Sequence, residues 1–298
     1  MKLIDGKGLS DTIKDEIAAE VKRLSAGQKR PPHLAAILVG EDPASAVYVR
    51  NKVRSCEKVG FESTHIKKRE NTSEEELLEI VHELNADEDI DGFIVQLPLP
   101  KHIDENKITL AIDPKKDVDG FHPTNFGKMA QGLPAYLPAT PFGIMTMLDR
   151  YNIEVQGKNC VVLGRSNIVG TPISILLSRK ATPGNATVTL CHSRTKNLEE
   201  YTRKADIIVI ALGIPNYLKA DMIKDGVVII DVGINRIEAP ERKSGYKLVG
   251  DADFEDVSRK CSFITPVPGG VGPMTVTSLL TNTLQAYKSN FLKNTDAN

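Results

Sequence analysis

The chain has 298 residues, a length that suits two domains of ordinary size better than one. It is 41% hydrophobic and 26% charged, and its net charge of −1 argues against nucleic acid or an anionic membrane as a partner held by overall charge. The N-terminus carries charges where a signal peptide needs an apolar core, and no apolar run reaches the roughly 20 residues of a membrane span, so we expect a cytoplasmic protein.

The first half alternates helical and strand-like segments. Apolar residues recur at helical spacing over 9–24, and Ser10 is placed to cap that helix. The segments that follow are a strand at 34–40, a helix at 44–59, a helix at 73–84 that opens with a capping box, and a strand at 92–100. This alternation predicts a mostly parallel sheet.

A segment at 113–140 interrupts the alternation. It is rich in Pro, Gly and Asp and lacks periodicity, so it is a candidate active-site segment or domain crossing. Thr140 is placed to cap a helix over 141–151. The segments predicted beyond it are strands at 160–164, 187–191, 206–213 and 227–233, a hairpin or arm at 235–250, a last strand near 262–265, and a final helix at 275–290.

A candidate dinucleotide site lies at 161–172, VVLGRSNIVGTP, where a strand, a glycine turn and a helix start follow one another. Gly164 permits the tight turn, Gly170 permits close helix packing, and a pyrophosphate would bind the helix N-terminus. Ser166 stands where the G-x-G-x-x-G pattern has its second glycine. The pattern alone equally admits an ordinary strand-to-helix turn.

The end of the next strand favours NADP over NAD. NAD enzymes usually place an acid there for the ribose hydroxyls, but this chain offers Ser193 and Arg194 instead. Arg165 adds a second guanidinium from the first turn. Two arginines and a serine are suitable donors for a 2′-phosphate, although each arginine alone could be a solvated surface charge.

Candidate catalytic groups lie in the first half. Tyr48 and Lys52 are four residues apart on one predicted helix and share a face. Y-x-x-x-K also occurs in short-chain dehydrogenases, but there it follows the nucleotide site, whereas here it precedes it. Gln96 ends an apolar strand, and Asp117 and Asp119 lie in KKDVDGF. A solvated lysine, a capped strand end and a turn explain the same residues without any function.

The segment PVPGGVGPMT at 266–275 has three glycines and three prolines in ten residues. Such a composition fixes an unusual backbone path and lets the backbone approach a ligand closely, which indicates a functional loop. The four cysteines and six histidines show no metal-ligand spacing, so no metal is predicted.

Five motifs occur in order along nearly the whole chain: YVRNK, VQLPLP, KDVDGF, GRSNIVGTP and PVPGGVGPMT. Together they closely resemble the bifunctional methylenetetrahydrofolate dehydrogenase/methenyltetrahydrofolate cyclohydrolase family. One departure is LPATP at 137–141, where the family commonly has Pro-Cys-Thr-Pro. Ala139 puts a thiol contribution there in doubt, but not the core chemistry.

The resemblance implies a two-domain α/β fold. Residues 1–140 and 275–298 would form a folate-binding catalytic domain, and 141–274 a Rossmann-type NADP-binding domain, with the C-terminal helix returning to the first domain. It also implies a homodimer in one-carbon metabolism. NADP⁺ would oxidise 5,10-methylenetetrahydrofolate to the 5,10-methenyl form, and water would open that product to 10-formyltetrahydrofolate.

The resemblance further implies residue roles. Lys52 would be the central catalytic residue, with Tyr48 as its partner and Gln96 as its hydrogen-bond tuner. Asp119 would hold the pterin edge, and Pro268, Gly269 and Gly270 would contact the substrate. The cofactor-binding residues would be Gly164, Arg165, Ser166, Ile168, Gly170, Ser193, Arg194 and Ile234. Because hydride loss leaves a cationic methenyl group, a useful Lys52 must be able to become neutral.

Three alternatives stay open at this point. The first is a dehydrogenase-only member of the same family, using NAD. The second is a two-domain dehydrogenase that acts on a small carbonyl compound. The third is a dinucleotide-sensing protein without turnover, which would not need Tyr48, Lys52, Gln96 and Asp119.

Overall fold

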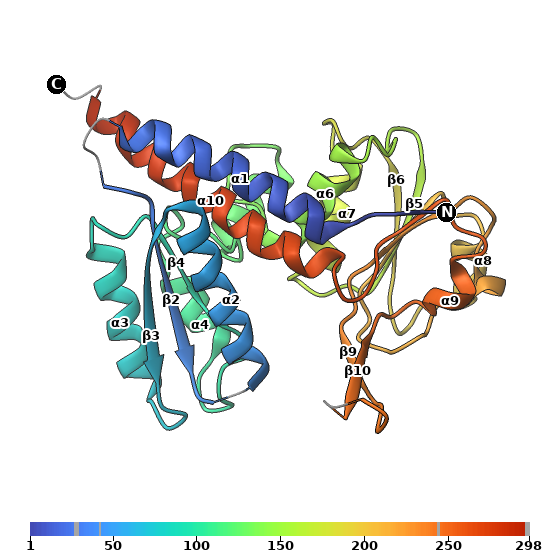
Figure 1. Ribbon diagram of the computed structural model, residues 1–298, viewed down its shortest axis with the longest axis horizontal. Helices are drawn as coiled ribbons and strands as arrows, with labels where there is room; N and C mark the ends of the chain where they lie inside the picture. The colour runs from blue at the N-terminus through green and yellow to red at the C-terminus, as the bar shows by residue number, and fades with distance from the viewer. Residues whose placement is uncertain (27–29, 42, 243–244, 296–298) are drawn as a thin grey trace. The chain divides into compact units, whose positions relative to one another are not determined.

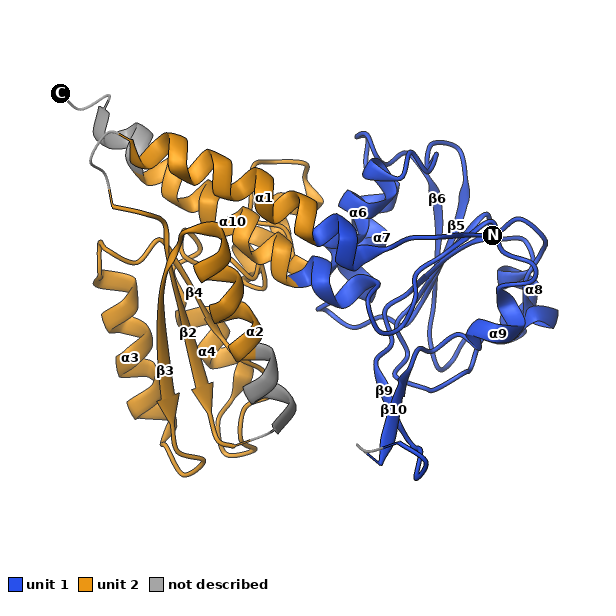
Figure 2. Ribbon diagram, viewed as in Figure 1, with its two compact units in different colours: residues 1–10, 140–275 blue, residues 11–139, 276–298 orange. Residues whose placement is uncertain are grey.

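The computed structural model describes the backbone of residues 1–26, 30–41, 43–242 and 245–295, and their side chains except at 43–48 and 291–295. The chain forms two compact units, residues 11–139 with 276–298 and residues 1–10 with 140–275 (Figure 2). Residues 1–10, which the expected division placed with the folate-binding part, therefore lie in the unit that contains 140–275. The ligand expected for each domain stays a prediction.

The unit of residues 11–139 and 276–298 is built on a three-stranded parallel sheet in the order β3-β2-β4. Its strands are β2 (His33–Val39), β3 (Glu62–Lys68) and β4 (Gly92–Val95). The central strand β2 is apolar and buried on both faces, which confirms the strand predicted at 34–40. The edge strand β3 was not predicted, because its sequence ESTHIKK is mostly polar.

Helices surround this sheet (Figure 1). They are α1 (Gly6–Ser25), α2 (Pro43–Val59), α3 (Glu74–Ala86), α4 (Glu105–Ala111), α5 (Pro123–Ala130) and α10 (Val271–Thr295). Ala35, Ile37 and Phe93 pack with Leu77 and Val81 of α3 in one buried core. Burial of such side chains contributes about 1.5–3 kcal/mol each, and this core holds β2 and β4 in place.

Three helix starts bear on the predictions. The helix predicted at 141–151 spans Ala139–Arg150, so Thr140 lies inside it and is not its cap. Ser73 caps α3, since its Oγ accepts the Glu76 N–H at 3.1 Å, which confirms the serine half of the predicted capping box; the Glu76 carboxylate pairs with Lys68 at 2.9 Å. The predicted cap at Ser10 is wrong. The helix begins at Gly6, and Asp5 accepts the Gly8 N–H at 3.0 Å, so Ser10 lies buried within the helix. Helix α5 was not predicted inside the aperiodic segment at 113–140.

From Val276 onward the C-terminal helix α10 belongs with the first half of the chain, as the fold prediction stated. Lys288 of α10 pairs with Glu20 of α1 at 2.6 Å, so the two helices lie side by side. The adjacent Tyr287 donates a hydrogen bond to the carbonyl of Arg30, shortly before β2, at 2.8 Å. The last helix is therefore anchored to segments far from it in sequence.

The unit of residues 1–10 and 140–275 contains a six-stranded sheet in the order β1-β11-β8-β7-β5-β6, with every pairing parallel. The strands are β1 (Lys2–Leu3), β5 (Asn159–Leu163), β6 (Thr187–Cys191), β7 (Ile207–Ile210), β8 (Val228–Asp231) and β11 (Phe263–Ile264). Strand β5 has β6 on one side and β7 on the other. The strand order thus reverses at β5, and a parallel sheet binds ligands outside the carboxyl ends of its strands at such a point.

The remaining elements of this unit are helices and a hairpin. They are α6 (Ala139–Arg150), α7 (Gly170–Ser178), α8 (Leu198–Thr202), η1 (Ala220–Met222), α9 (Phe254–Val257), β9 (Asn235–Glu238) and β10 (Tyr246–Val249). The antiparallel β9–β10 pair is the hairpin predicted at 235–250 and projects as an arm in Figure 1. No helix within the described residues is both long enough and apolar enough to cross a membrane.

Candidate active site

Lys52 and Gln96 meet in the unit of residues 11–139 and 276–298. Lys52 lies on α2, is only 5% exposed, and donates a hydrogen bond from Nζ to Gln96 Oε1 at 3.1 Å. Gln96 directly follows β4. Its backbone N–H donates to the Ile37 carbonyl at 2.9 Å, and its side-chain Nε2 donates to the Leu97 carbonyl at 2.7 Å. These two bonds turn the amide oxygen toward the amine.

Burial shifts the pKa of Lys52. Loss of water around the amine lowers the pKa of Lys52, and the nearby carboxylate of Asp119 opposes this effect without cancelling it. Cys56 lies one turn further along α2, and burial raises the pKa of its thiol to about 12. The thiol is therefore neutral at physiological pH and supplies no counter-charge. A lysine in this setting gives up its proton more readily than a solvated one and can act as a base.

Tyr48 lies on α2, one turn before Lys52. Its side chain is outside the part of the chain whose side chains the structure describes. Helix geometry places the two residues on one face, and the role predicted for Tyr48 stays a prediction.

Asp117 and Asp119 have different surroundings. The Asp117 carboxylate is buried and accepts three hydrogen bonds, from the N–H groups of Phe121 (3.2 Å) and His122 (2.8 Å) and from Asn125 Nδ2 (2.9 Å). Burial raises the pKa of Asp117 to about 6, against the effect of these donors. Asp117 therefore fixes the backbone of the segment that leads into α5. Asp119 lies two residues after Asp117, in the same segment.

Asp119 lines a small cavity together with Leu97 and Phe121. Its side chain is partly buried. Burial raises the pKa of Asp119, and the Lys52 amine acts in the opposite direction. Because the Asp119 carboxylate is only partly buried, a ligand can reach it. It can accept hydrogen bonds from N–H groups at the edge of a heterocyclic ring.

The backbone around Asp119 is fixed from two distant segments. The Ala139 N–H donates to the Asp119 carbonyl at 3.2 Å. Asn282 of α10 donates from Nδ2 to the carbonyls of Val118 (2.8 Å) and Leu137 (2.9 Å). Asn282, which is 1% exposed, was not predicted from the sequence. The one feature that could have indicated it is a polar amide on a helix whose neighbouring residues are apolar and buried.

The glycine turn after β5 has the predicted backbone. Gly164 has φ +107°, and a Cβ there would lie 2.3 Å from the Ala211 carbonyl oxygen. A Cβ at Gly170 would lie 1.9 Å from the Gly164 oxygen. Ser166 replaces the second glycine of the pattern and accepts the N–H groups of Val169 (3.2 Å) and Gly170 (3.4 Å) through its Oγ. The serine therefore stabilises the turn that opens α7.

The next strand end brings the basic residues to the same edge. Strands β5 and β6 are parallel neighbours with Leu163 opposite Cys191, so the turns that follow them lie at one edge of the sheet. Arg165, Ser193 and Arg194 are exposed on these turns. The glycines let the backbone approach a pyrophosphate closely. The two arginines and the serine are hydrogen-bond donors with no acidic residue among them, which suits a dinucleotide that carries a 2′-phosphate.

Two further cofactor candidates are exposed apolar residues at this edge. Ile168 is 45% exposed in the turn after β5, and Ile234 is 58% exposed shortly after β8. Solvent-exposed isoleucines at strand ends can contact the flat faces of a dinucleotide. The contact of each with the cofactor stays a prediction.

The segment at 266–270 contains both reachable and packed residues. Pro268 is exposed, and Gly269, with φ +104°, has open space where a Cβ would be. Gly270 is buried, and a Cβ at Gly6 would lie 1.8 Å from its carbonyl oxygen. The Lys7 N–H donates to the Gly269 carbonyl at 2.8 Å. Gly270 thus serves packing against the start of α1, and Pro268 and Gly269 remain available to a ligand.

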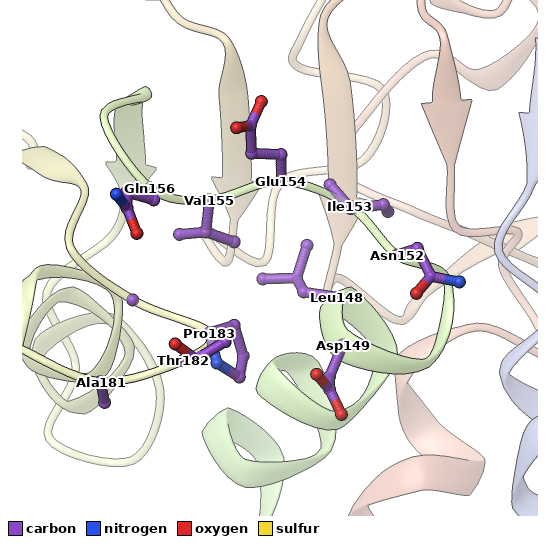
Figure 3. Close-up of a pocket in the computed structure, with 11 residues that line it drawn as sticks. Leu148, Asp149, Asn152, Ile153, Glu154, Val155, Gln156, Ala181, Thr182 and Pro183 are labelled. Carbon is purple, nitrogen blue, oxygen red and sulfur yellow. The ribbon is translucent and has the colours of Figure 1, made fainter.

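A larger hollow lies elsewhere in the unit of residues 1–10 and 140–275 (Figure 3). It has a volume of about 400 Å³ and is lined by 148–149 and 152–156, before β5, and 181–184, before β6. These segments lie at the amino ends of the strands, opposite the candidate cofactor edge. Among the residues that the structure describes, no three His, Cys, Asp or Glu side chains gather as metal ligands.

Comparisons with known proteins cover nearly the whole chain. Residues 4–119 match the catalytic-domain model of tetrahydrofolate dehydrogenase/cyclohydrolase, and 138–291 match its NAD(P)-binding-domain model. The chain is 60% identical to the bifunctional protein FolD of Flavobacterium johnsoniae over 99% of this chain and 100% of the relative. It is 59% identical to FolD of Cytophaga hutchinsonii, over 96% and 99%.

Solved structures of enzymes from the same family have the same fold as this chain. The FolD enzyme of Campylobacter jejuni superposes with a TM-score of 0.91 at 48% identity, over 97% of this chain and 99% of that one. The Trypanosoma brucei methylenetetrahydrofolate dehydrogenase-cyclohydrolase, solved with NADP and an inhibitor, also has a TM-score of 0.91. Its identity is 37%, over 96% and 97% of the two chains.

Proposed function

The chain belongs to the tetrahydrofolate dehydrogenase/cyclohydrolase family, and we propose that it oxidises 5,10-methylenetetrahydrofolate with NADP⁺ and hydrolyses the methenyl product to 10-formyltetrahydrofolate. The observation that carries this proposal is the buried Lys52–Gln96 pair. A dehydrogenase alone needs no base that can lose its proton beside the folate. A cyclohydrolase needs one to activate water.

The first reaction leaves a cation on the folate. NADP⁺ supplies the hydride acceptor when bound. Hydride loss from the methylene bridge spreads a positive charge over the bridge carbon and the two nitrogens beside it. A protonated Lys52 would oppose this charge, whereas the neutral amine favoured by burial does not. Burial therefore makes the uncharged amine, the form that does not oppose oxidation, easier to reach.

In the second reaction Lys52 acts as the general base. The neutral amine takes a proton from water as the water oxygen bonds to the methenyl carbon. The Lys52 ammonium then gives this proton to N5 as the bond from that carbon to N5 breaks, and the hydroxyl left on the carbon loses its own proton to solvent as the formyl C=O forms. Gln96 orients the amine through its 3.1 Å hydrogen bond without adding charge. Tyr48, on the same helical face, is the proposed partner near the bridge carbon.

Asp119 holds the pterin in this proposal. Its carboxylate accepts two parallel hydrogen bonds from the amidine-like edge of the ring. Pro268 and Gly269 add contacts from an exposed loop, and Gly270 supports that loop by packing. Residues 1–140 and 275–298 would bind folate and 141–274 would bind NADP, in line with the two matched family models.

The cofactor residues are also part of the proposal. Gly164, Ser166 and Gly170 form the turn that accepts the pyrophosphate. Arg165, Ser193 and Arg194 bind the 2′-phosphate and so favour NADP over NAD. Ile168 and Ile234 supply apolar contacts. We also propose a homodimer and a cytoplasmic location; light scattering after size exclusion tests the first, and fractionation of cells tests the second.

One assay tests the proposed function. Purified protein is mixed with 5,10-methylenetetrahydrofolate and NADP⁺, and NADPH and methenyl absorbance are followed together. Comparison with acid-quenched samples, in which 10-formyltetrahydrofolate cyclises back, reveals the hydrolysed product. NADPH that rises while methenyl stays low supports both reactions. Matching accumulation of methenyl would leave a dehydrogenase alone, and no signal with NADP⁺ or NAD⁺ would contradict the proposal.

A further inference from the structure

Two buried carboxylates in the unit of residues 1–10 and 140–275 have no part in the mechanism above. Asp231 ends β8 and is 3% exposed, and Asp251 follows β10 and is 0% exposed. Both lie near the carboxyl ends of the strands, where the candidate cofactor turn also lies. Because burial of a carboxylate is costly, its hydrogen bonds indicate what it is there to hold.

Asp231 positions Asp251. It accepts hydrogen bonds from the N–H groups of Gly233 (3.0 Å), Asp251 (2.9 Å) and Ala252 (2.8 Å). A Cβ at Gly250 would lie 1.8 Å from Asp231 Oδ2, so the chain passes this carboxylate at a distance that only glycine allows. The backbone at Asp251 is therefore fixed to the end of β8.

Asp251 in turn holds the segment that follows β7. Its Oδ2 accepts the N–H groups of Leu212 at 2.6 Å and Gly213 at 2.9 Å. Its Oδ1 accepts a hydrogen bond from Asn235 Nδ2 at 2.8 Å. One carboxylate oxygen thus satisfies two consecutive backbone donors that the sheet does not use, which fixes the direction of the chain as it leaves β7.

This segment adjoins the glycine turn of the cofactor site. Strands β7 and β5 are parallel neighbours, and the strand order reverses at β5. A Cβ at Gly164 would lie only 2.3 Å from the Ala211 carbonyl oxygen. The turn after β5 and the turn after β7 are therefore in contact. Gly213 has φ +70° with open space where a Cβ would be, and Ile214 is 47% exposed. The segment therefore presents bare backbone and an apolar side chain beside the turn.

We propose that Asp251 is a positioning residue for the dinucleotide: it fixes residues 211–214 against the Gly164 turn, so that this segment forms a wall of the cofactor site and Ile214 contacts the bound dinucleotide. The inference rests on the proposed NADP site and adds to it a wall that no motif in the sequence indicated. Asp231 supports Asp251 by accepting the hydrogen bond from its backbone N–H.

The test measures NADPH binding directly by fluorescence titration, with the KM for NADP⁺ as a second readout. Asp251→Ala is expected to raise the dissociation constant of NADPH about 10- to 100-fold, the usual cost of losing hydrogen bonds to a charged group. Hydrolysis of 5,10-methenyltetrahydrofolate needs no NADP and should stay within about twofold of wild type. Asp251→Asn should restore most of the affinity. The side-chain oxygen of the new asparagine can still accept both N–H groups, and the side-chain amide of Asn235 can flip so that its oxygen faces the new NH₂ group.

Two more variants keep the result interpretable. Asp206→Ala is the matched control: Asp206 accepts the Asn159 N–H at 2.8 Å and pairs with Lys224 at 2.5 Å, at the amino ends of the same sheet. It should lower stability without changing NADPH affinity. Ile214→Ser leaves the Asp251 bonds intact and is expected to weaken NADPH binding even if Asp251→Ala fails to fold.

The outcomes separate this inference from the proposed function. NADPH affinity at the wild-type value in both Asp251→Ala and Ile214→Ser would overturn the inference, as would an equal loss in Asp206→Ala. A wild-type protein that binds NADPH but does not act on folates would contradict the proposed function, and the role of Asp251 would still be decided by the titrations.

Discussion

Lys52 Nζ donates a 3.1 Å hydrogen bond to Gln96 Oε1 and so joins the middle of α2 to the end of β4. A second lysine on the same helix shows what is unusual about this one. Lys58 has a side chain that is 44% exposed and pairs with Asp11 at the surface, and that ion pair raises the pKa of Lys58. Burial lowers the pKa of Lys52. The same residue type is therefore a surface cation at one position and a candidate base at the other.

The first prediction concerns the pH dependence of hydrolysis. Because the neutral amine is the active form, the cyclohydrolase rate should rise with pH as Lys52 loses its proton. Gln96→Glu places a carboxylate against the amine, which raises the pKa of Lys52 and should move the rising limb about 1 to 3 pH units higher. The measurement is kcat/KM for methenyl hydrolysis against pH, with the uncatalysed rate subtracted. A limb at the wild-type position would argue against Lys52 as the base.

The second prediction concerns the pterin site. Asp119→Asn keeps the shape of the side chain but removes its charge and replaces one acceptor with a donor. The KM for 5,10-methylenetetrahydrofolate should rise about 10- to 100-fold, with NADPH affinity unchanged. Asp87→Asn, at an exposed position of the same unit, is the control and should leave both constants as they are. Unchanged folate affinity in Asp119→Asn would remove Asp119 from the site.

The third prediction concerns the support of the Asp119 loop by α10. Asn282→Ala leaves the buried carbonyls of Val118 and Leu137 without this donor. The free energy of unfolding should fall by about 1–3 kcal/mol, and the KM for folate should rise as well. Asn290→Ala removes a 3.4 Å bond to Asp91 near the far end of α10 and serves as the control. If stability falls but the KM stays constant, Asn282 holds the helix only and not the site.

Much of this architecture could be predicted because it is local. Strand β6 spans the predicted residues 187–191, since TVTLC is a short run of β-branched and apolar residues, which favours a strand. Gln96 was a candidate because a polar residue at the end of an apolar parallel strand lies at the ligand edge, but its role was predicted only from the family resemblance. The Lys52–Gln96 contact then required only that the predicted helix pack near that strand end.

The rest depends on contacts between distant residues. Asn282 reaches carbonyls 164 and 145 residues away, and no periodicity signals such a pair. Asp251 was unremarked because its partners, Leu212 and Gly213, become neighbours only after the sheet has formed. Strand β3 is polar because it lies at an edge, where one face meets solvent, so it lacks the apolar run that marked β2.

The fourth prediction concerns cofactor choice. Arg194→Ala should weaken NADP⁺ about 10- to 100-fold while changing NAD⁺ little, because only NADP carries the 2′-phosphate. The measurement is kcat/KM for each cofactor at saturating folate. Arg259→Ala, an exposed arginine of the same unit, is the control for overall charge. Equal losses with both cofactors in Arg194→Ala would contradict the assignment.

The central claim is that Lys52 serves the hydrolytic step, and Lys52→Met tests it most directly. Methionine keeps the length and apolar stem of the side chain and removes the amine. Wild type and variant are mixed with 5,10-methylenetetrahydrofolate and NADP⁺ and followed at the NADPH and methenyl absorbances, with Lys58→Met as the control. We expect the variant still to form NADPH, to accumulate methenyl in step with it, and to hydrolyse added methenyltetrahydrofolate at least about 100-fold more slowly. Hydrolysis at the wild-type rate in Lys52→Met would contradict the role of Lys52 as the base.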